Sequence, residues 1–113
     1  MALVGNLVEI EDIQLDEYGF LCDRSLWAKS VAELLSKQDG LELTVDHWEI
    51  ILFMQNYYEQ YRHQPNARLF SKAIKKTLGE EKGSSIYLYR LFPDGPLKYA
   101  NKYAGLPIPP SCI

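Results

Sequence analysis

Cysteine is scarce in this chain, with only Cys22 and Cys112 among 113 residues. Two cysteines are too few for a disulfide framework, and neither lies in a C-x-x-C or other metal-binding spacing. No apolar run approaches the roughly 18 residues that are needed to cross a bilayer. The N-terminal residues also lack the basic region and long apolar stretch of a secretion signal. These absences predict a cytoplasmic protein with free thiols, no membrane association and no metal.

The rest of the composition is typical of a globular protein, with 47% hydrophobic and 24% charged residues. A chain of 113 residues is near the common size of one domain and is long enough to bury a core. We expect one globular domain over residues 1–104 and an arm over residues 105–113.

Charge is unevenly divided along the chain, although the net charge is only −3. Residues 1–59 carry twelve acidic and three basic side chains, whereas residues 60–113 carry nine basic and three acidic ones. Such a basic half is either an ordinary solvated face or a positive surface for an acidic partner, a nucleic acid or an anionic sulfur species.

Hydrophobic periodicity and capping residues predict a mainly α fold of the α+β class. Thr44 is a natural N-cap, Pro96 suits the first turn of a helix, and Gly40, Gly79 and Gly105 suit helix ends. We expect a β-hairpin over residues 3–15, a turn over residues 16–19, and helices from Asp23 or Ser25 to about Lys37 and over residues 44–62, 66–79, 83–92 and 96–104. The architecture is then a small orthogonal helical bundle with an N-terminal β-hairpin, a helix-turn-helix-like pair and an extended C-terminal arm.

The last nine residues place a cysteine one position from the C-terminus, after prolines at positions 107, 109 and 110. A structural thiol normally lies inside a helix or strand, where neighbours pack around it. Seven residues from Gly105 to Cys112 in a polyproline-like path would span about 22 Å. That reach would let the Cys112 thiol enter a pocket of another protein.

Several segments together resemble the DsrC/TusE family over nearly the whole chain. The segments that carry the resemblance are Asp46-His47-Trp48-Glu49, Gly79-Glu80-Glu81-Lys82-Gly83, Tyr87-Leu88-Tyr89-Arg90-Leu91-Phe92-Pro93, Gly95-Pro96, Ala104-Gly105-Leu106-Pro107 and Cys112-Ile113. The resemblance implies a mostly helical fold and sulfur carried on Cys112 as a covalent persulfide, with no other cofactor. Cys22 has no counterpart in the family pattern, and we expect it to be a packed small hydrophobic residue.

The position of a second arm cysteine divides this family, and Asn101 occupies that position here. The single-cysteine pattern is similar to the TusE branch. It implies a sulfurtransferase that acts as a stoichiometric carrier in tRNA wobble-uridine 2-thiolation. Its partners would be a TusB–TusC–TusD-like sulfur donor complex and the tRNA 2-thiouridylase. We expect a monomer that does not bind nucleic acid directly.

Sulfur transfer requires attack by a thiolate, and at an ordinary thiol pKa only about 3% of a cysteine is ionised at pH 7. The neighbouring terminal carboxylate raises the pKa of the Cys112 thiol further, so a partner or the basic face must activate it. Arg68, Lys72, Lys75 and Lys76 are the candidates for docking an anion or a partner, against the alternative of a plain solvated face.

Two other functions remain open at the level of sequence. The first is an accessory, gamma-subunit-like role with sulfite reductase, which Asn101 disfavours. The second is a sulfur-related DNA-binding regulator that uses the helix-turn-helix-like pair. Against it, the chain is acidic overall and lacks a recognition helix rich in Arg, Asn and Gln. His47 is expected to pack at a helix start rather than act as a base.

Overall fold

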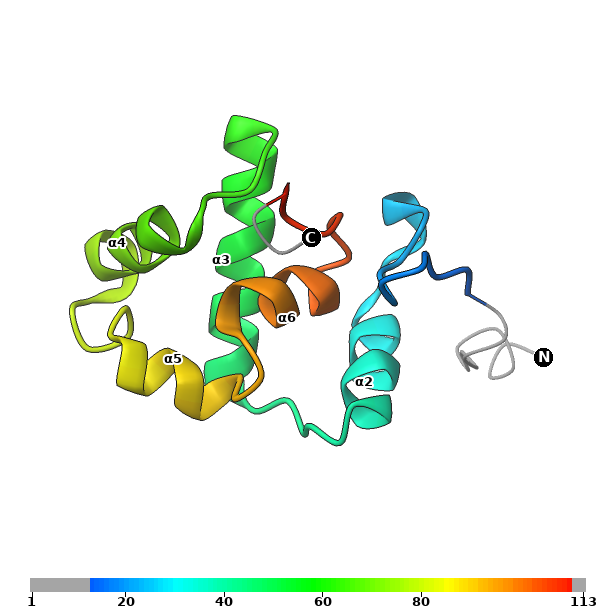
Figure 1. Ribbon diagram of the computed structural model, residues 1–113, viewed down its shortest axis with the longest axis horizontal. Helices are drawn as coiled ribbons and strands as arrows, with labels where there is room; N and C mark the ends of the chain where they lie inside the picture. Colours follow the sequence, from blue (N-terminus) through cyan, green and yellow to red (C-terminus); the bar gives the residue numbers. More distant parts are fainter. Residues whose placement is uncertain (1–12, 111–113) are drawn as a thin grey trace.

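The computed structural model describes residues 13–110, and Figure 1 shows their arrangement. The elements are η2 (Arg24–Leu26), a 3-10 helix, followed by the α-helices α2 (Lys29–Gln38), α3 (Val45–Tyr61), α4 (Ala67–Leu78), α5 (Ser85–Leu91) and α6 (Pro96–Tyr103). The mainly helical fold is confirmed, and residues 13–110 contain no β-sheet. The hairpin expected over residues 3–15 falls almost entirely outside the described residues. None of the described helices is long and apolar enough to span a membrane.

The turn expected over residues 16–19 is present. The Asp16 amide donates to the Phe20 carbonyl over 2.7 Å, and the Asp16 carboxylate accepts the Phe20 amide over 2.9 Å. Leu15 and Leu21 on either side of the turn form an isolated antiparallel bridge. The Asp16 side chain therefore closes the turn and also fixes Phe20, where the next segment begins.

The single helix expected from Asp23 or Ser25 to Lys37 is wrong, because the structure divides it in two. Asp23 caps the 3-10 helix η2, accepting the Ser25 amide over 3.0 Å, but Trp27 and Ala28 are extended and α2 begins only at Lys29. The break frees Trp27 to turn its indole toward the end of α6, where Nε1 donates to the Tyr103 carbonyl over 2.7 Å. A contact between residues 76 positions apart thus overrides local helix propensity.

The later helices begin at the residues that the sequence indicates. Asn66 and Ser84 accept backbone amides as the N-caps of α4 and α5, and Pro96 occupies the first turn of α6. At the start of α3, the His47 ring accepts the Thr44 amide through Nδ1 over 3.1 Å. The other nitrogen, Nε2, lies 2.6 Å from the Leu91 carbonyl and donates to it, which joins α3 to α5.

Helix α6 is the centre of the fold, because it packs on α2, α3 and α5. Figure 1 shows it crossing in front of α3, as expected for an orthogonal bundle. The core side chains around it are Val31, Ala32, Leu35, Ile50, Ile51, Met54, Phe70, Ile74, Leu88, Leu91, Phe92, Leu97, Ala100, Tyr103, Ala104 and Leu106. The chain therefore leaves its most enclosed helix to form the C-terminal segment.

Polar contacts also tie α6 to the end of α2. The Tyr103 hydroxyl donates to Asp39 Oδ2 over 2.7 Å, and the same oxygen accepts Lys102 Nζ over 2.8 Å. Burial, followed by the hydrogen bond to Asp39, raises the pKa of Tyr103 well above its usual range. Tyr103 is therefore a neutral donor at physiological pH, and the contact does not change with pH there.

Helices α2 and α6 end in the same motif. The Gly40 amide donates to the Lys37 carbonyl and the Leu41 amide to the Ser36 carbonyl; Gly105 and Leu106 make the equivalent bonds to residues 102 and 101. This is the Schellman motif, and its glycine takes a positive φ, here 77° at Gly40 and 76° at Gly105. The surroundings of the two glycines differ. A Cβ at Gly40 would meet nothing within 4 Å, whereas one at Gly105 would overlap Trp27 Cδ1 and lie 2.8 Å from its Cγ.

This pair provides a test of the Trp27 contact. Gly40→Ala should lower the free energy of unfolding by about 1–2 kcal/mol, because alanine is strained at positive φ. Gly105→Ala carries the same strain and also forces Trp27 aside, so it should cost about 1–3 kcal/mol more. Urea denaturation of both variants measures the difference. Equal losses would show that Trp27 does not pack tightly on Gly105.

Candidate functional site

Cys112, the residue expected to carry sulfur, lies outside the described residues. The structure follows the chain to Pro110, two residues before it. The described part of the site is therefore the segment over residues 104–110, which leads to Cys112, together with the surface next to it.

Three side chains hold the last residue of α6 and this segment by their backbone carbonyls. Trp27 donates to the Tyr103 carbonyl, Gln55 Nε2 donates to the Ala104 carbonyl over 2.9 Å, and Gln64 Nε2 donates to the Pro107 carbonyl. The last carbonyls of a helix have no partner within the helix, and leaving them buried and unpaired is costly. Donors from the η2–α2 break, from α3 and from the connection between α3 and α4 satisfy the carbonyls here, so the chain direction after α6 is fixed.

The segment is also packed against the body. Leu106 is fully buried in the core, and Pro109 is among the most enclosed side chains of the structure. The reach of 22 Å, counted from Gly105, is therefore an overestimate. Counted from Pro109, three residues of chain can span at most about 10 Å. Helix α6 ends at Tyr103, but the chain stays in contact with the core as far as Pro109, six residues further.

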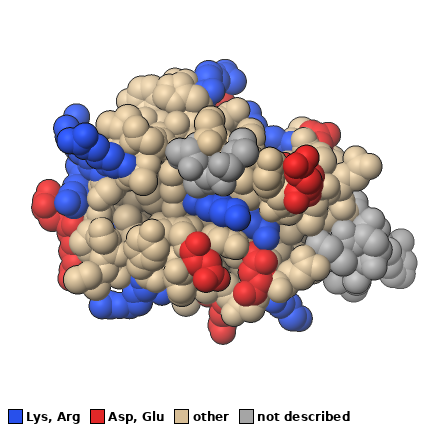
Figure 2. Space-filling model, in the orientation of Figure 1, with Lys and Arg blue, Asp and Glu red and all other residues tan. Residues whose placement is uncertain are grey.

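The four cations expected to dock an anion or a partner lie on one face of α4. At 3.6 residues per turn, positions 68, 72, 75 and 76 fall within about a third of the helix circumference, opposite to Phe70 and Ile74. Figure 2 shows Lys and Arg side chains gathered over the end of the molecule where α4 lies. None of the four forms an ion pair with a residue in the range 13–110.

The four cations are not equivalent. Arg68, Lys72 and Lys76 are exposed, whereas Lys75 is half-buried because its stem covers Gly83, where a Cβ would overlap Lys75 Cγ. Arg68 lines a pocket of about 790 Å³ between α4, α5 and α6, together with Phe70, Leu88, Tyr89, Leu97 and Lys98. Gln64, which holds Pro107, lies three positions before Ala67, the first residue of α4. The residue that anchors Pro107 therefore lies close in the chain to Arg68, where the basic face begins.

The two histidines have the surroundings that the sequence indicates. His47 is buried and its two ring nitrogens are engaged by the start of α3 and by Leu91, so it is a structural residue. His63 is exposed, and its Nδ1 lies 3.1 Å from the Gln64 carbonyl. Cys22 differs from expectation. It is exposed rather than packed, because the turn before it places its side chain at the surface.

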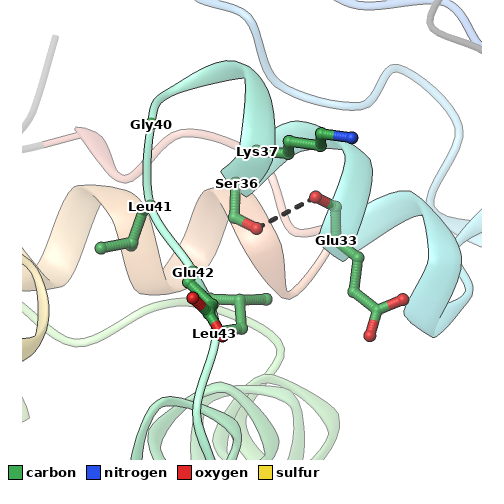
Figure 3. Close-up of a pocket in the computed structure, with 7 residues that line it drawn as sticks. All are labelled: Glu33, Ser36, Lys37, Gly40, Leu41, Glu42 and Leu43. Carbon is green, nitrogen blue, oxygen red and sulfur yellow. Dashed lines mark hydrogen bonds between the residues drawn. The ribbon is translucent and has the colours of Figure 1, made fainter.

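A separate pocket of about 530 Å³ lies at the end of α2 (Figure 3). Its rim carries Glu33, Lys37 and Glu42 around Leu41 and Leu43, and the Ser36 hydroxyl donates to the Glu33 carbonyl over 3.1 Å. No group of three His, Cys, Asp or Glu side chains suited to a metal ion occurs within residues 13–110.

Comparison with known proteins decides the family. A family model described as "DsrC like protein" matches residues 7–113. The chain belongs to the DsrC-like family. It is 48% identical to "Sulfurtransferase TusE" of Photorhabdus laumondii over 105 residues, which cover 93% of this chain and 95% of that protein. The solution structure of Allochromatium vinosum DsrC has a TM-score of 0.83 and 47% identity, covering 94% of this chain and 96% of that one.

A third comparison links the same fold to sulfite reductase. The crystal structure of the oxidized gamma-subunit of the dissimilatory sulfite reductase (DsrC) from Archaeoglobus fulgidus has a TM-score of 0.75 and 40% identity, covering 86% of this chain and 89% of that one. The names of the curated relatives confirm that the chain is a sulfurtransferase and a sulfur-relay carrier, as the sequence resemblance implied. Identity is 41–48% to the TusE relatives and 32–47% to the solved DsrC structures, and because these ranges overlap the branch depends on particular residues.

Proposed function

We propose that this protein accepts a persulfide on Cys112 and passes its outer sulfur on for tRNA wobble-uridine 2-thiolation. The observation that carries the proposal is a penultimate cysteine that follows a core-anchored segment, in a chain 48% identical to a named sulfurtransferase. The body fixes where the segment emerges, and Cys112 follows within three residues of Pro109. A partner then has to accommodate only the last residues of the chain.

The transfer is a thiol displacement that needs no cofactor beyond the covalent sulfur. The Cys112 thiolate attacks the outer sulfur of a donor persulfide, forms a new S–S bond and releases the donor as its thiolate. The reverse displacement at an acceptor cysteine returns Cys112 to a thiol. Because the thiolate is the attacking species, positive charge in a partner's pocket would activate Cys112 during the transfer.

The partners follow from the branch to which the chain is assigned. The donor is a TusB–TusC–TusD-like complex and the acceptor is the tRNA 2-thiouridylase. Because both act on cytosolic substrates, we place the protein in the cytoplasm, where a reducing environment keeps its thiols free. The carrier acts as a monomer, since each transfer requires the C-terminal segment of one chain to be accessible.

The exposed cations of α4 form the docking surface for these partners. Arg68, Lys72 and Lys76 have no acidic partner within the described part of the chain. They lie on the helix that follows Gln64, the anchor of Pro107. An acidic rim around a partner's active site would therefore orient the carrier with its C-terminal segment toward that site.

Asn101 favours this branch over a role with sulfite reductase. The residue is completely buried, and its Nδ2 donates to the Leu97 carbonyl over 2.7 Å. Where the two-cysteine members have a thiol, this chain therefore has a packed amide that cannot form a disulfide. The helix-turn-helix-like pair gives no stronger case for DNA. The protein is acidic overall, and α4 itself contains no Asn or Gln that could read a base.

Substitution of the two cysteines tests the assignment of Cys112. Cys112→Ser should abolish sulfur acceptance from a cysteine desulfurase and its relay proteins, because no thiol remains at the end of the chain. Cys22→Ser should accept sulfur like the unchanged protein. Intact-protein mass spectrometry reads the adduct of about 32 Da. Equal loading of the Cys112→Ser variant would overturn the assignment.

Charge reversal tests the docking surface. Lys72→Glu should slow sulfur transfer from the donor complex by roughly three- to tenfold at low ionic strength, and the effect should fade as salt is added. Lys37→Glu makes the same charge change at an exposed site on α2 and should transfer sulfur at nearly the original rate. Identical rates for both variants would exclude α4 as the docking surface.

A further inference from the structure

The pocket of about 790 Å³ between α4, α5 and α6 has no occupant under the proposed function. Figure 1 shows α4 and α5 at the end of the molecule away from α2, with α6 beside them. The floor of this α4–α5–α6 groove consists of Phe70, Leu88 and Leu97, one core side chain from each helix. A volume of this class encloses a drug-sized ligand, so the groove has room for more than one side chain of a partner.

The wall that α5 forms carries exposed apolar side chains. Tyr89 lines the groove and is 56% exposed, and Ile86, three residues earlier on the same helix, is 75% exposed. Large apolar side chains that stay in the solvent beside a concave surface are typical of protein interfaces, where aromatic residues are enriched. The groove therefore suits the apolar side chains of another protein.

The rim of the groove carries a net positive charge. Arg68 of α4 and Lys98 of α6 both line it, and neither forms an ion pair with another residue in the described part of the chain. Lys98 Nζ lies over the Tyr99 ring, 5.6 Å from its centroid. Asp94 is the one acidic residue among those that line the groove. An apolar floor with a positive rim complements a segment in which acidic side chains flank apolar ones.

The surrounding helices favour a helical segment as the occupant. Residues 13–110 contain no β-sheet to which an extended peptide could add a strand. A groove between helices instead receives one face of an amphipathic helix, whose apolar anchors are spaced by three or four residues. Acidic residues beside these anchors would pair with Arg68 and Lys98 through charge-assisted hydrogen bonds.

Charge also distinguishes between the two relay partners of the proposed function. The acceptor works on tRNA, and the phosphates of a nucleic acid are bound by positively charged surfaces. A positive groove would there face a surface of like charge, which disfavours association. The sulfur donor has no nucleic acid to bind and is free to present an acidic segment.

We propose that the α4–α5–α6 groove binds an acidic amphipathic helix of the sulfur donor complex. The apolar side chains of that helix lie on the floor of the groove beside Tyr89, and its acidic side chains pair with Arg68 and Lys98. Lys72 extends the contact, because it lies one turn beyond Arg68 on the same side of α4. This inference rests on the proposed function, which supplies the donor.

The rate of sulfur transfer from the TusB–TusC–TusD-like complex tests both kinds of contact. Tyr89→Ser should lower kcat/KM by about fivefold or more, mainly by raising KM, because an exposed aromatic anchor is lost. Arg68→Glu should lower it by a similar factor at low ionic strength, and the loss should shrink as salt is added. Asp94→Asn removes the acidic residue of the rim and should raise kcat/KM by about two- to threefold at low salt.

Two substitutions away from the groove are the matched controls. Tyr61→Ser removes another tyrosine of similar exposure, on α3, and Lys37→Glu makes the same charge change as Arg68→Glu, on α2. Both should accept sulfur at nearly the original rate. Asp94→Asn keeps the test decisive if Tyr89→Ser destabilises the fold, because a loss of stability does not make transfer faster. Equal losses in the groove variants and the controls, or slower transfer to Asp94→Asn, would overturn the proposal.

Loading of the unchanged protein separates this inference from the proposed function. If neither the donor complex nor inorganic polysulfide loads the carrier, the proposed function fails. If the donor complex loads the unchanged protein and Tyr89→Ser equally well, only the inference about the groove fails. Loading by polysulfide alone would overturn the donor complex as the partner that the groove binds.

Two further outcomes would assign the groove to a different occupant. If Tyr89→Ser slowed delivery from the loaded carrier to the tRNA 2-thiouridylase as much as it slowed loading, the choice of the donor would be wrong. If the unchanged protein sedimented as a dimer and Tyr89→Ser as a monomer, a second copy of the chain would fill the groove, and the proposal would be refuted.

Discussion

The contact of Trp27 with the chain at Tyr103 and Gly105 determines most of what is distinctive in this fold. The indole donates to the last carbonyl of α6 and lies against a glycine that has no room for a side chain. To make this contact, the chain gives up helical structure between η2 and α2. As a result, Trp27 satisfies the last carbonyl of α6, and Leu106, which follows the helix, is buried in the core.

Under the proposed function, this constraint limits how much of the chain a partner would have to order. If the segment after α6 were held only by its prolines, the position of Cys112 would vary over a wide volume, and each docking event would have to order the whole segment. With the segment anchored by Trp27, Gln55 and Gln64, only the residues after Pro109 remain for a partner to position. The same anchoring makes Gly105 and Pro107 part of the wall of a pocket that Cys22 also lines.

Local signals in the sequence predicted the features that depend on local interactions. Thr44, Asn66 and Ser84 each begin a helix as expected, because a cap acts within three residues of itself. The glycine ends of α2 and α6 were predicted for the same reason.

The features that sequence reasoning missed depend on contacts between distant residues. Nothing near Trp27 indicates that a residue 76 positions away will draw it out of a helix. In the sequence, Gln55 of α3 and Gln64 of the following turn look like ordinary solvated side chains. Only their contacts with the C-terminal segment show that they anchor it. Leu106 was the one available signal, since a large apolar residue in a proline-rich segment favours burial. The exposure of Cys22 follows from the bridge between Leu15 and Leu21, which composition does not show.

Amide hydrogen exchange at Leu106 tests the central claim, that the root of the C-terminal segment is part of the core. The Leu106 amide donates to the Asn101 carbonyl over 3.1 Å and its side chain is fully buried. It should exchange as slowly as the amides of α6, through opening of the whole fold. Exchange at the rate of an unstructured peptide, while α6 stays protected, would contradict the account.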